Sequence, residues 1–104
     1  MINLNQIERI EYMEKILDES NEIANQLFDI LEKYETLKEK YRELVDYYSG
    51  DDWLKDFESD EAGNLPEDLK RGVLSEDAVY YLMSKNRLIT IKMLEIVTNN
   101  IKNP

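Results

Sequence analysis

Residues 64–83, NLPEDLKRGVLSEDAVYYLM, hold two helix starts and one helix stop within a short span. Pro66 suits the first position of a short helix because that position needs no N–H partner. Gly72 fits a helix end. Ser75 is a good N-cap, and the two acidic residues after it favour the positive end of a new helix. Every special residue here has a backbone role, so the segment predicts a joint between helices.

Upstream of the joint, residues 5–48 predict one long helix that no Pro or Gly interrupts. Asn5 can cap it, with Glu8 as the reciprocal half of a capping box. A bend is plausible near 18–22, where polar residues cluster, and both a straight and a bent helix stay open. Apolar residues fill three adjacent heptad rows, a stripe as wide as a bundle helix buries. The rows are Ile16–Ile23–Ile30–Leu37–Leu44, Ile10–Leu17–Ala24–Leu31–Lys38–Val45 and Met13–Ser20–Leu27–Tyr34–Tyr41–Tyr48.

Residues 51–72 are predicted to form one or two short helices and a loop. Gly50 can supply the left-handed position on which helices commonly end. Asp51 and Asp52 can then cap the short helix that follows. The segment 58–64 reads as a loop because small and polar residues crowd it.

These patterns predict an all-α fold in a single domain, 1–104. The long N-terminal helix packs antiparallel on a C-terminal helix over 75–101, as in a helical hairpin or bundle, and the short helices between them seal one end. If the first helix is straight, the shorter last helix leaves apolar rows uncovered, and a homodimer is their simplest partner. The sealing residues are Trp53, Leu54, Phe57, Leu65 and Leu69, and the last helix's stripe is Val79, Leu82, Met83, Ile89, Met93, Ile96 and Val97.

The formal net charge of −10 argues against nucleic acid and anionic lipid as direct partners, because phosphate binding needs cationic side chains. The charge is uneven. Residues 1–48 carry 12 acids and 6 bases (−6), residues 49–72 carry 8 and 3 (−5), and residues 73–104 carry 3 and 4 (+1). No apolar run approaches the ~18 residues of a membrane helix, and the start of the chain does not resemble a signal peptide. A cytoplasmic location is therefore expected.

The segment 47–82 resembles a family of small bacterial proteins known as a domain of unknown function, DUF4298. The resemblance implies a bacterial, mostly helical, cytosolic protein and carries no activity, ligand or catalytic residue. The N-terminal helix resembles the family only in being long and amphipathic. The matching residues are Tyr47, Tyr48, Ser49, Trp53, Asp56, Leu65, Pro66, Lys70, Gly72, Val73, Leu74, Ser75, Glu76, Asp77 and Tyr80.

We expect no enzyme, no cofactor and no metal centre. The chain has no histidine and no cysteine, the residues that most readily supply acid–base chemistry near pH 7 and thiolate ligands. Within the acidic stretch 51–67, the residues from Asp56 onward can be aligned with a calcium-binding loop. That alignment puts Glu61 at the position where the loop needs Gly. A solvated acidic loop is the simpler interpretation. In that alignment the oxygen ligands of a calcium ion would be Asp56, Glu58, Asp60, Asn64 and Glu67.

The leading functional prediction is a non-catalytic protein–protein interaction or scaffold module. The alternative is an acidic regulator that mimics nucleic acid and occupies a basic partner's cleft, since residues 1–72 carry most of the negative charge. The tyrosine row is either the edge of the chain's own core or part of an interface with another chain. The interface candidates are Tyr34, Tyr41, Tyr48, Leu27, Ile30 and Leu37.

Overall fold

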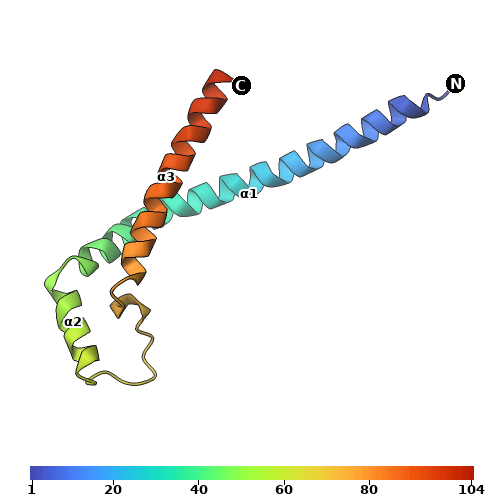
Figure 1. The fold of residues 1–104 in the computed structure, drawn as a ribbon. Coiled ribbons are helices and arrows are strands. Elements are labelled where there is room, and N and C mark those ends of the chain that lie inside the picture. The colour runs from blue at the N-terminus through green and yellow to red at the C-terminus, as the bar shows by residue number, and fades with distance from the viewer. The chain divides into compact units, whose positions relative to one another are not determined.

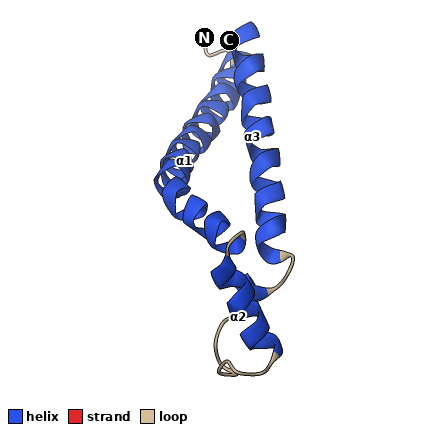
Figure 2. Ribbon diagram, turned by 90° about the vertical axis from the view of Figure 1, so that its left-hand side faces the viewer, coloured by secondary structure: helices blue, strands red, loops and turns tan.

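The computed structural model describes residues 1–104 as three α-helices and one 3-10 helix, without a strand (Figures 1 and 2). In chain order these are α1 (Leu4–Tyr48), α2 (Asp51–Glu61), η1 (Gly72–Leu74) and α3 (Ala78–Lys102). The predicted all-α fold is confirmed, with a long N-terminal helix, a C-terminal helix and short helices between them.

The chain divides into two compact units, Met1–Glu39 and Lys40–Pro104. The first unit contains no element other than α1. The second unit holds the last turns of α1 together with α2, η1 and α3. Both buried side chains of the protein, Leu74 and Val79, belong to this second unit. The second unit therefore contains what core the chain has.

The start of α1 lies slightly upstream of the predicted start. The predicted capping box of Asn5 and Glu8 is wrong, because the Asn3 side-chain oxygen Oδ1 accepts the Gln6 backbone N–H at 3.2 Å. Asn3 and Asn5 are both good cap residues. The earlier one lets the helix form additional backbone hydrogen bonds, beginning with the Ile7 amide to the Asn3 carbonyl at 3.1 Å. From there α1 continues through 18–22 without a break.

The loop predicted over 58–64 is partly wrong, because α2 runs through its first half. Gly63 has φ 74° and is the one residue of the chain with a left-handed backbone. Its amide donates to the Asp60 carbonyl at 3.0 Å. The next amide, of Asn64, donates to the Ser59 carbonyl at 3.0 Å. This pair of bonds is a Schellman motif, which satisfies the last carbonyls of a helix.

Gly50 does not adopt the predicted left-handed conformation. Its φ of −105° and ψ of 177° are extended, and it occupies the N-cap position of α2. Asp51 and Asp52 therefore lie in the first helical turn and do not cap it, although their charges suit the positive helix end. A Cβ on Gly50 would lie 3.1 Å from the Asp46 carbonyl oxygen. Gly50 is thus required by the close approach of the backbone and not by its φ.

The short helix predicted to start at Pro66 is reduced to a turn, in which the Leu69 amide donates to the Pro66 carbonyl at 3.2 Å. A helix this short gains too few hydrogen bonds to offset the cost of nucleation. The Arg71 guanidinium stabilises the turn instead. It donates to the carbonyls of Pro66 and Leu69 and forms a salt bridge with Asp60 of α2. Gly72 then begins η1 rather than ending a helix.

Ser75, the predicted cap of the last helix, is the C-cap of η1, and its side chain also bonds the first residue of α3. Its backbone is extended, with φ −70° and ψ 146°. Its side-chain oxygen Oγ accepts the Ala78 amide N–H at 3.2 Å, and its hydroxyl donates to the Gly72 carbonyl at 2.9 Å. Ser75 therefore ends η1 and starts the approach to α3 with a single side chain. The predicted side-chain hydrogen bond of Ser75 is therefore formed, but the helix begins later than predicted: the N-cap residue of α3 is Asp77, whose side chain makes no cap hydrogen bond.

Ser75→Ala is expected to lower the free energy of unfolding by about 1 kcal/mol, because the Ala78 amide loses its acceptor. Urea unfolding followed by far-UV circular dichroism at pH 7 measures the change. Ser84→Ala is the matched control, since Ser84 is an exposed residue inside α3 and alanine favours helices. Equal stability of Ser75→Ala and the wild-type protein would contradict the capping role.

Candidate interaction surface

Three aromatic rings pack together where α1 meets α2. The Trp53 ring lies edge-on to Tyr48, with ring centroids 5.2 Å apart and planes at 71°. It stacks on Phe57 at 5.1 Å and 16°. Trp53 and Phe57 are four residues apart on α2, so both face the same side of the helix. Each such ring pair contributes about 0.5–1.5 kcal/mol beyond the area it buries.

The same tryptophan joins α2 to η1. The Trp53 indole N–H donates to the Val73 carbonyl at 2.9 Å. Beside this bond lie the two buried side chains, Leu74 at the end of η1 (6% exposed) and Val79 at the start of α3 (3%). The Val73 carbonyl and the buried Leu74 side chain thus hold the connecting segment against the helices. We call the cluster of Tyr48, Trp53, Phe57, Val73, Leu74 and Val79 the joint.

The end of α1 is tied to the approach to α3 through the joint. The Tyr48 hydroxyl donates to the Glu76 carbonyl at 2.7 Å. Of the five predicted sealing residues, Trp53, Phe57 and Leu65 are half-buried, whereas Leu54 and Leu69 are exposed. Leu54 follows Trp53 directly, so when the tryptophan faces the joint its neighbour is rotated away from it. Leu69 is exposed because it belongs to the turn that replaces the predicted helix.

A tyrosine–carboxylate hydrogen bond also joins the end of α1 to α2. The Tyr47 hydroxyl donates to Asp56 Oδ2 at 2.6 Å. This bond raises the pKa of Tyr47 to about 12, with smaller contributions from burial and from the negative charges of Asp56 and Asp52. Ionising the phenol would remove the donor and place two negative charges side by side, so the bond holds Tyr47 neutral.

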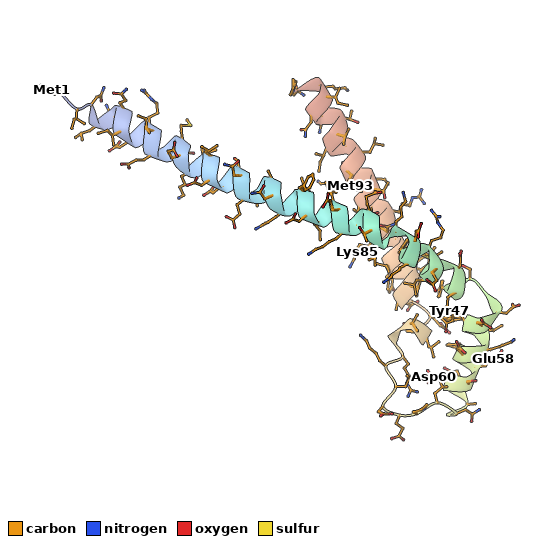
Figure 3. All side chains as sticks on the ribbon, turned by 180° about the vertical axis from the view of Figure 1, so that it is seen from behind. Met1, Tyr47, Glu58, Asp60, Lys85 and Met93 are labelled. Atoms are coloured by element: carbon orange, nitrogen blue, oxygen red, sulfur yellow. The ribbon has the colours of Figure 1, made fainter.

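The fold does not bring together the five residues of the calcium-loop alignment. Asp56, Glu58 and Asp60 lie two positions apart on α2, a spacing that directs alternate side chains to opposite sides of a helix (Figure 3). Asp56 and Asp60 already have the hydrogen-bond partners described above. Asn64 and Glu67 follow the helix on the connecting segment. No group of three or more carboxylates in the chain is placed to hold a metal ion.

The predicted heptad rows form an exposed apolar surface on α1. Ile23 is 61% exposed and Leu27 53%, although both are large apolar residues in the middle of a helix. Ser20 and Ala24, the small members of the rows, are exposed as well. We call the large apolar residues of this surface the α1 face: Ile10, Met13, Ile16, Leu17, Ile23, Leu27, Ile30, Leu31 and Leu37.

The predicted interface candidates separate into two groups. Leu27, Ile30 and Leu37 belong to the exposed α1 face. Tyr34, Tyr41 and Tyr48 are half-buried, and Tyr48 already serves the joint. Tyr48 thus belongs to the chain's own aromatic cluster, whereas Leu27, Ile30 and Leu37 remain exposed.

The opposite side of α1 is acidic. A heptad row that contains no apolar residue runs along it, and all of its members are exposed. Such a row lies about half a turn away from the apolar rows. The helix is therefore amphipathic, with one apolar and one negatively charged side. The row consists of Glu11, Asp18, Asn25, Glu32, Glu39 and Asp46.

Comparison with known families agrees with the resemblance noted in the sequence. The model of the family described as "Domain of unknown function (DUF4298)" matches residues 10–96, which is most of the chain. The chain belongs to the DUF4298 family. No curated protein and no solved structure matches the chain. No helix of this DUF4298 protein combines the length and apolarity that crossing a membrane requires.

The residues that carry the DUF4298 resemblance are largely those that build the joint. Tyr47 and Asp56 bond to each other, Trp53 bonds to η1, and Ser75 caps the approach to α3. No residue of the α1 face belongs to that set. The motif of this DUF4298 chain thus describes how the helices are joined, and the exposed surface lies elsewhere.

Sequence reasoning missed the two side-chain pairs that brace the joint, Tyr47–Asp56 and Arg71–Asp60. The first pair crosses the turn at Gly50. The signal for it was the presence of both residues in the family motif, which did not indicate that they are partners. The second pair joins segments eleven residues apart, and its formation depends on how the connecting segment folds back.

Tyr47→Phe is expected to lower the free energy of unfolding by about 1 kcal/mol at pH 7, through loss of the hydrogen bond to Asp56. The raised pKa means that folding favours the neutral phenol, so this stabilisation is complete below pH 10. It is lost as the pH rises toward about 12. Urea unfolding of the wild-type protein and the variant between pH 7 and 12 measures the difference.

Tyr12→Phe is the control, because Tyr12 is an exposed tyrosine of α1. It should match the wild-type protein throughout. A stability difference between Tyr47→Phe and the wild-type protein that stays constant up to pH 12 would contradict the assigned cause of the pKa shift.

Proposed function

We propose that this protein is a non-catalytic interaction module that binds an amphipathic helix of another polypeptide along the α1 face. The observation that carries the proposal is the exposure of nine large apolar side chains in heptad rows on one side of one helix. Contiguous apolar surface of this kind on a soluble protein marks a binding site far more often than scattered apolar residues do.

The energetic argument favours occupation of the α1 face. Burying one leucine or isoleucine contributes about 1.5–3 kcal/mol. Association costs about 4–15 kcal/mol in lost freedom of motion, so several such residues must be buried together. The α1 face supplies enough of them on one rigid element. Most of a helix's stability in a protein comes from packing of its apolar face, which means that the partner stabilises α1 while binding to it.

The spacing of the rows favours a helix as the occupant. Residues repeating every seven positions form holes that accept side chains with the same repeat from a facing helix. Three rows rather than two give a surface that can receive one helix or a pair of helices. A strand would meet this surface with a mismatched period.

The joint supports this function without taking part in chemistry. It fixes the end of α1 with satisfied hydrogen bonds and two buried apolar side chains, so that binding on α1 does not have to order the second unit. The joint contains no histidine or cysteine, and the one perturbed group beside it, Tyr47, is held in the neutral form. We further propose a cytoplasmic location, which the absence of cysteine fits.

The acidic row supports a second candidate, the mimic of nucleic acid that occupies a basic cleft. In that case the binding surface would be the side of α1 opposite the α1 face. Attraction between exposed charges is screened within about 8 Å at physiological salt, so this binding would collapse as salt rises. Binding through the α1 face would survive high salt.

Leu27→Asp is expected to abolish partner capture, because it places an unpaired charge in the middle of an apolar interface. Asn25→Asp is the matched control: it adds the same charge to the acidic row. Tagged forms of both variants and the wild-type protein are incubated with lysate of the parent cell at low and high salt, and the eluates are identified by mass spectrometry.

The proposal expects a protein that the wild type and Asn25→Asp retain in high salt and that Leu27→Asp does not retain. Fluorescence of Trp53, the single tryptophan, checks that the joint is intact in each variant. A partner that all three forms capture only at low salt would contradict binding through the α1 face and favour the acidic candidate.

A further inference from the structure

We propose that the occupant of the α1 face is α1 of a second copy of this chain, running antiparallel, with Ala24 beside the two-fold axis. This inference rests on the proposed function, because it names the helix that the α1 face receives. It is carried by the order of residues along the helix, which makes the α1 face complementary to itself in one antiparallel register.

The register follows from the heptad rows. In an antiparallel pair, each of the two rows that form the seam faces the other of these rows on the partner helix. The two seam rows here are Ile16–Ile23–Ile30–Leu37 and Met13–Ser20–Leu27–Tyr34. If Ile23 of one copy faces Leu27 of the other, the remaining layers are fixed by counting outward from this pair. Ser20 then faces Ile30, which places a small side chain against a branched one. The layers, each formed twice, are Ile23–Leu27, Ser20–Ile30, Ile16–Tyr34 and Met13–Leu37.

The residues on either side of the paired seam are also complementary. Along one edge Glu19 of each copy faces Lys33 of the other, giving two pairs of opposite charge. Along the other edge Leu17 faces Leu31, and Ala24 faces Ala24 at the centre. A small residue at the symmetry axis lets the two backbones approach closely. No pair of like charges arises along either edge in this register.

A parallel pairing in register is less favourable. It places Lys33 of each copy against Lys38 of the other, a like-charge pair that occurs on both sides of the dimer. It also places Ser20 opposite Ser20, in the middle of the apolar seam. The antiparallel register avoids both defects, since Lys33 meets Glu19 and Ser20 meets Ile30.

The extent of the pairing coincides with the first unit of the chain. In the antiparallel register Glu11 of one copy lies opposite Glu39 of the other, so the paired segment is 11–39 and falls within Met1–Glu39. This overlap is about 43 Å long. The joint and α3 are not needed for the pairing, because they belong to Lys40–Pro104.

Charge reversal tests the pairing. Sedimentation equilibrium of the wild-type protein at low salt should give the mass of a dimer. Glu19→Lys and Lys33→Glu should each weaken dimerisation by about ten-fold, since each turns two attractive pairs into repulsive ones. The double variant Glu19→Lys/Lys33→Glu should recover wild-type affinity. Glu32→Lys, the same reversal as Glu19→Lys but on the acidic row, should not weaken the dimer.

Disulfide formation tests the direction of the helices, because the natural chain contains no cysteine. A mixture of Ser20→Cys and Ile30→Cys chains should form a mixed disulfide under mild oxidation. Ser20→Cys alone should form none, since two copies of residue 20 lie about 15 Å apart in the antiparallel register. A rapid disulfide of Ser20→Cys with itself would show a parallel pair and overturn the inference.

A monomeric mass of the wild-type protein would also overturn the inference, and it would mean that something else, such as this chain's own α3, covers the α1 face. A monomer that captures a foreign protein through Leu27 would leave the proposed function standing. A monomer whose captured proteins are insensitive to Leu27→Asp would overturn both the inference and the proposed function.

Discussion

The hydrogen bond from the Trp53 indole N–H to the Val73 carbonyl is the contact on which the organisation of the second unit depends. It joins α2 to η1 across the connecting segment, and it satisfies the one polar atom that a tryptophan needs to place when its ring is covered. The Tyr48 and Phe57 rings pack on the same indole. Without this donor the Val73 carbonyl and the apolar neighbour Leu74 would have no fixed position against α2.

The two units of the chain differ in which side chains are satisfied within the chain itself. In the joint, polar side chains have partners, and the acids that might suggest an ion site are instead used by Tyr47 and Arg71. On α1, apolar side chains are exposed in regular rows. An unpaired polar group makes a protein unstable, whereas an uncovered apolar row makes it associate. The joint therefore stabilises the fold, and the α1 face is the surface to which we assign the function.

The sequence predicted the long elements well because their signals are repeated many times. Heptad rows identified α1 and its apolar side, and local chemistry identified the Ser75 side chain as a hydrogen-bond acceptor at the approach to α3. Features decided by a single contact outside the regular helices were missed. Gly50 is constrained by a nearby carbonyl and not by φ, and the turn after Pro66 is held by a side chain that reaches back from Arg71. The rows also could not show which residues the chain itself covers, because periodicity does not say what lies opposite a helix.

Hydrogen–deuterium exchange at two protein concentrations, resolved by segment, tests most directly whether the joint is self-sufficient while α1 depends on another molecule. We expect amides of 11–39 to be protected at high concentration and to exchange faster after dilution, because α1 then loses the packing of its apolar face that supplies most of a helix's stability. Amides of 47–57 and 73–82 should keep the same protection at both concentrations. Protection of 11–39 that does not change with concentration, or loss of protection in the joint on dilution, would contradict the account.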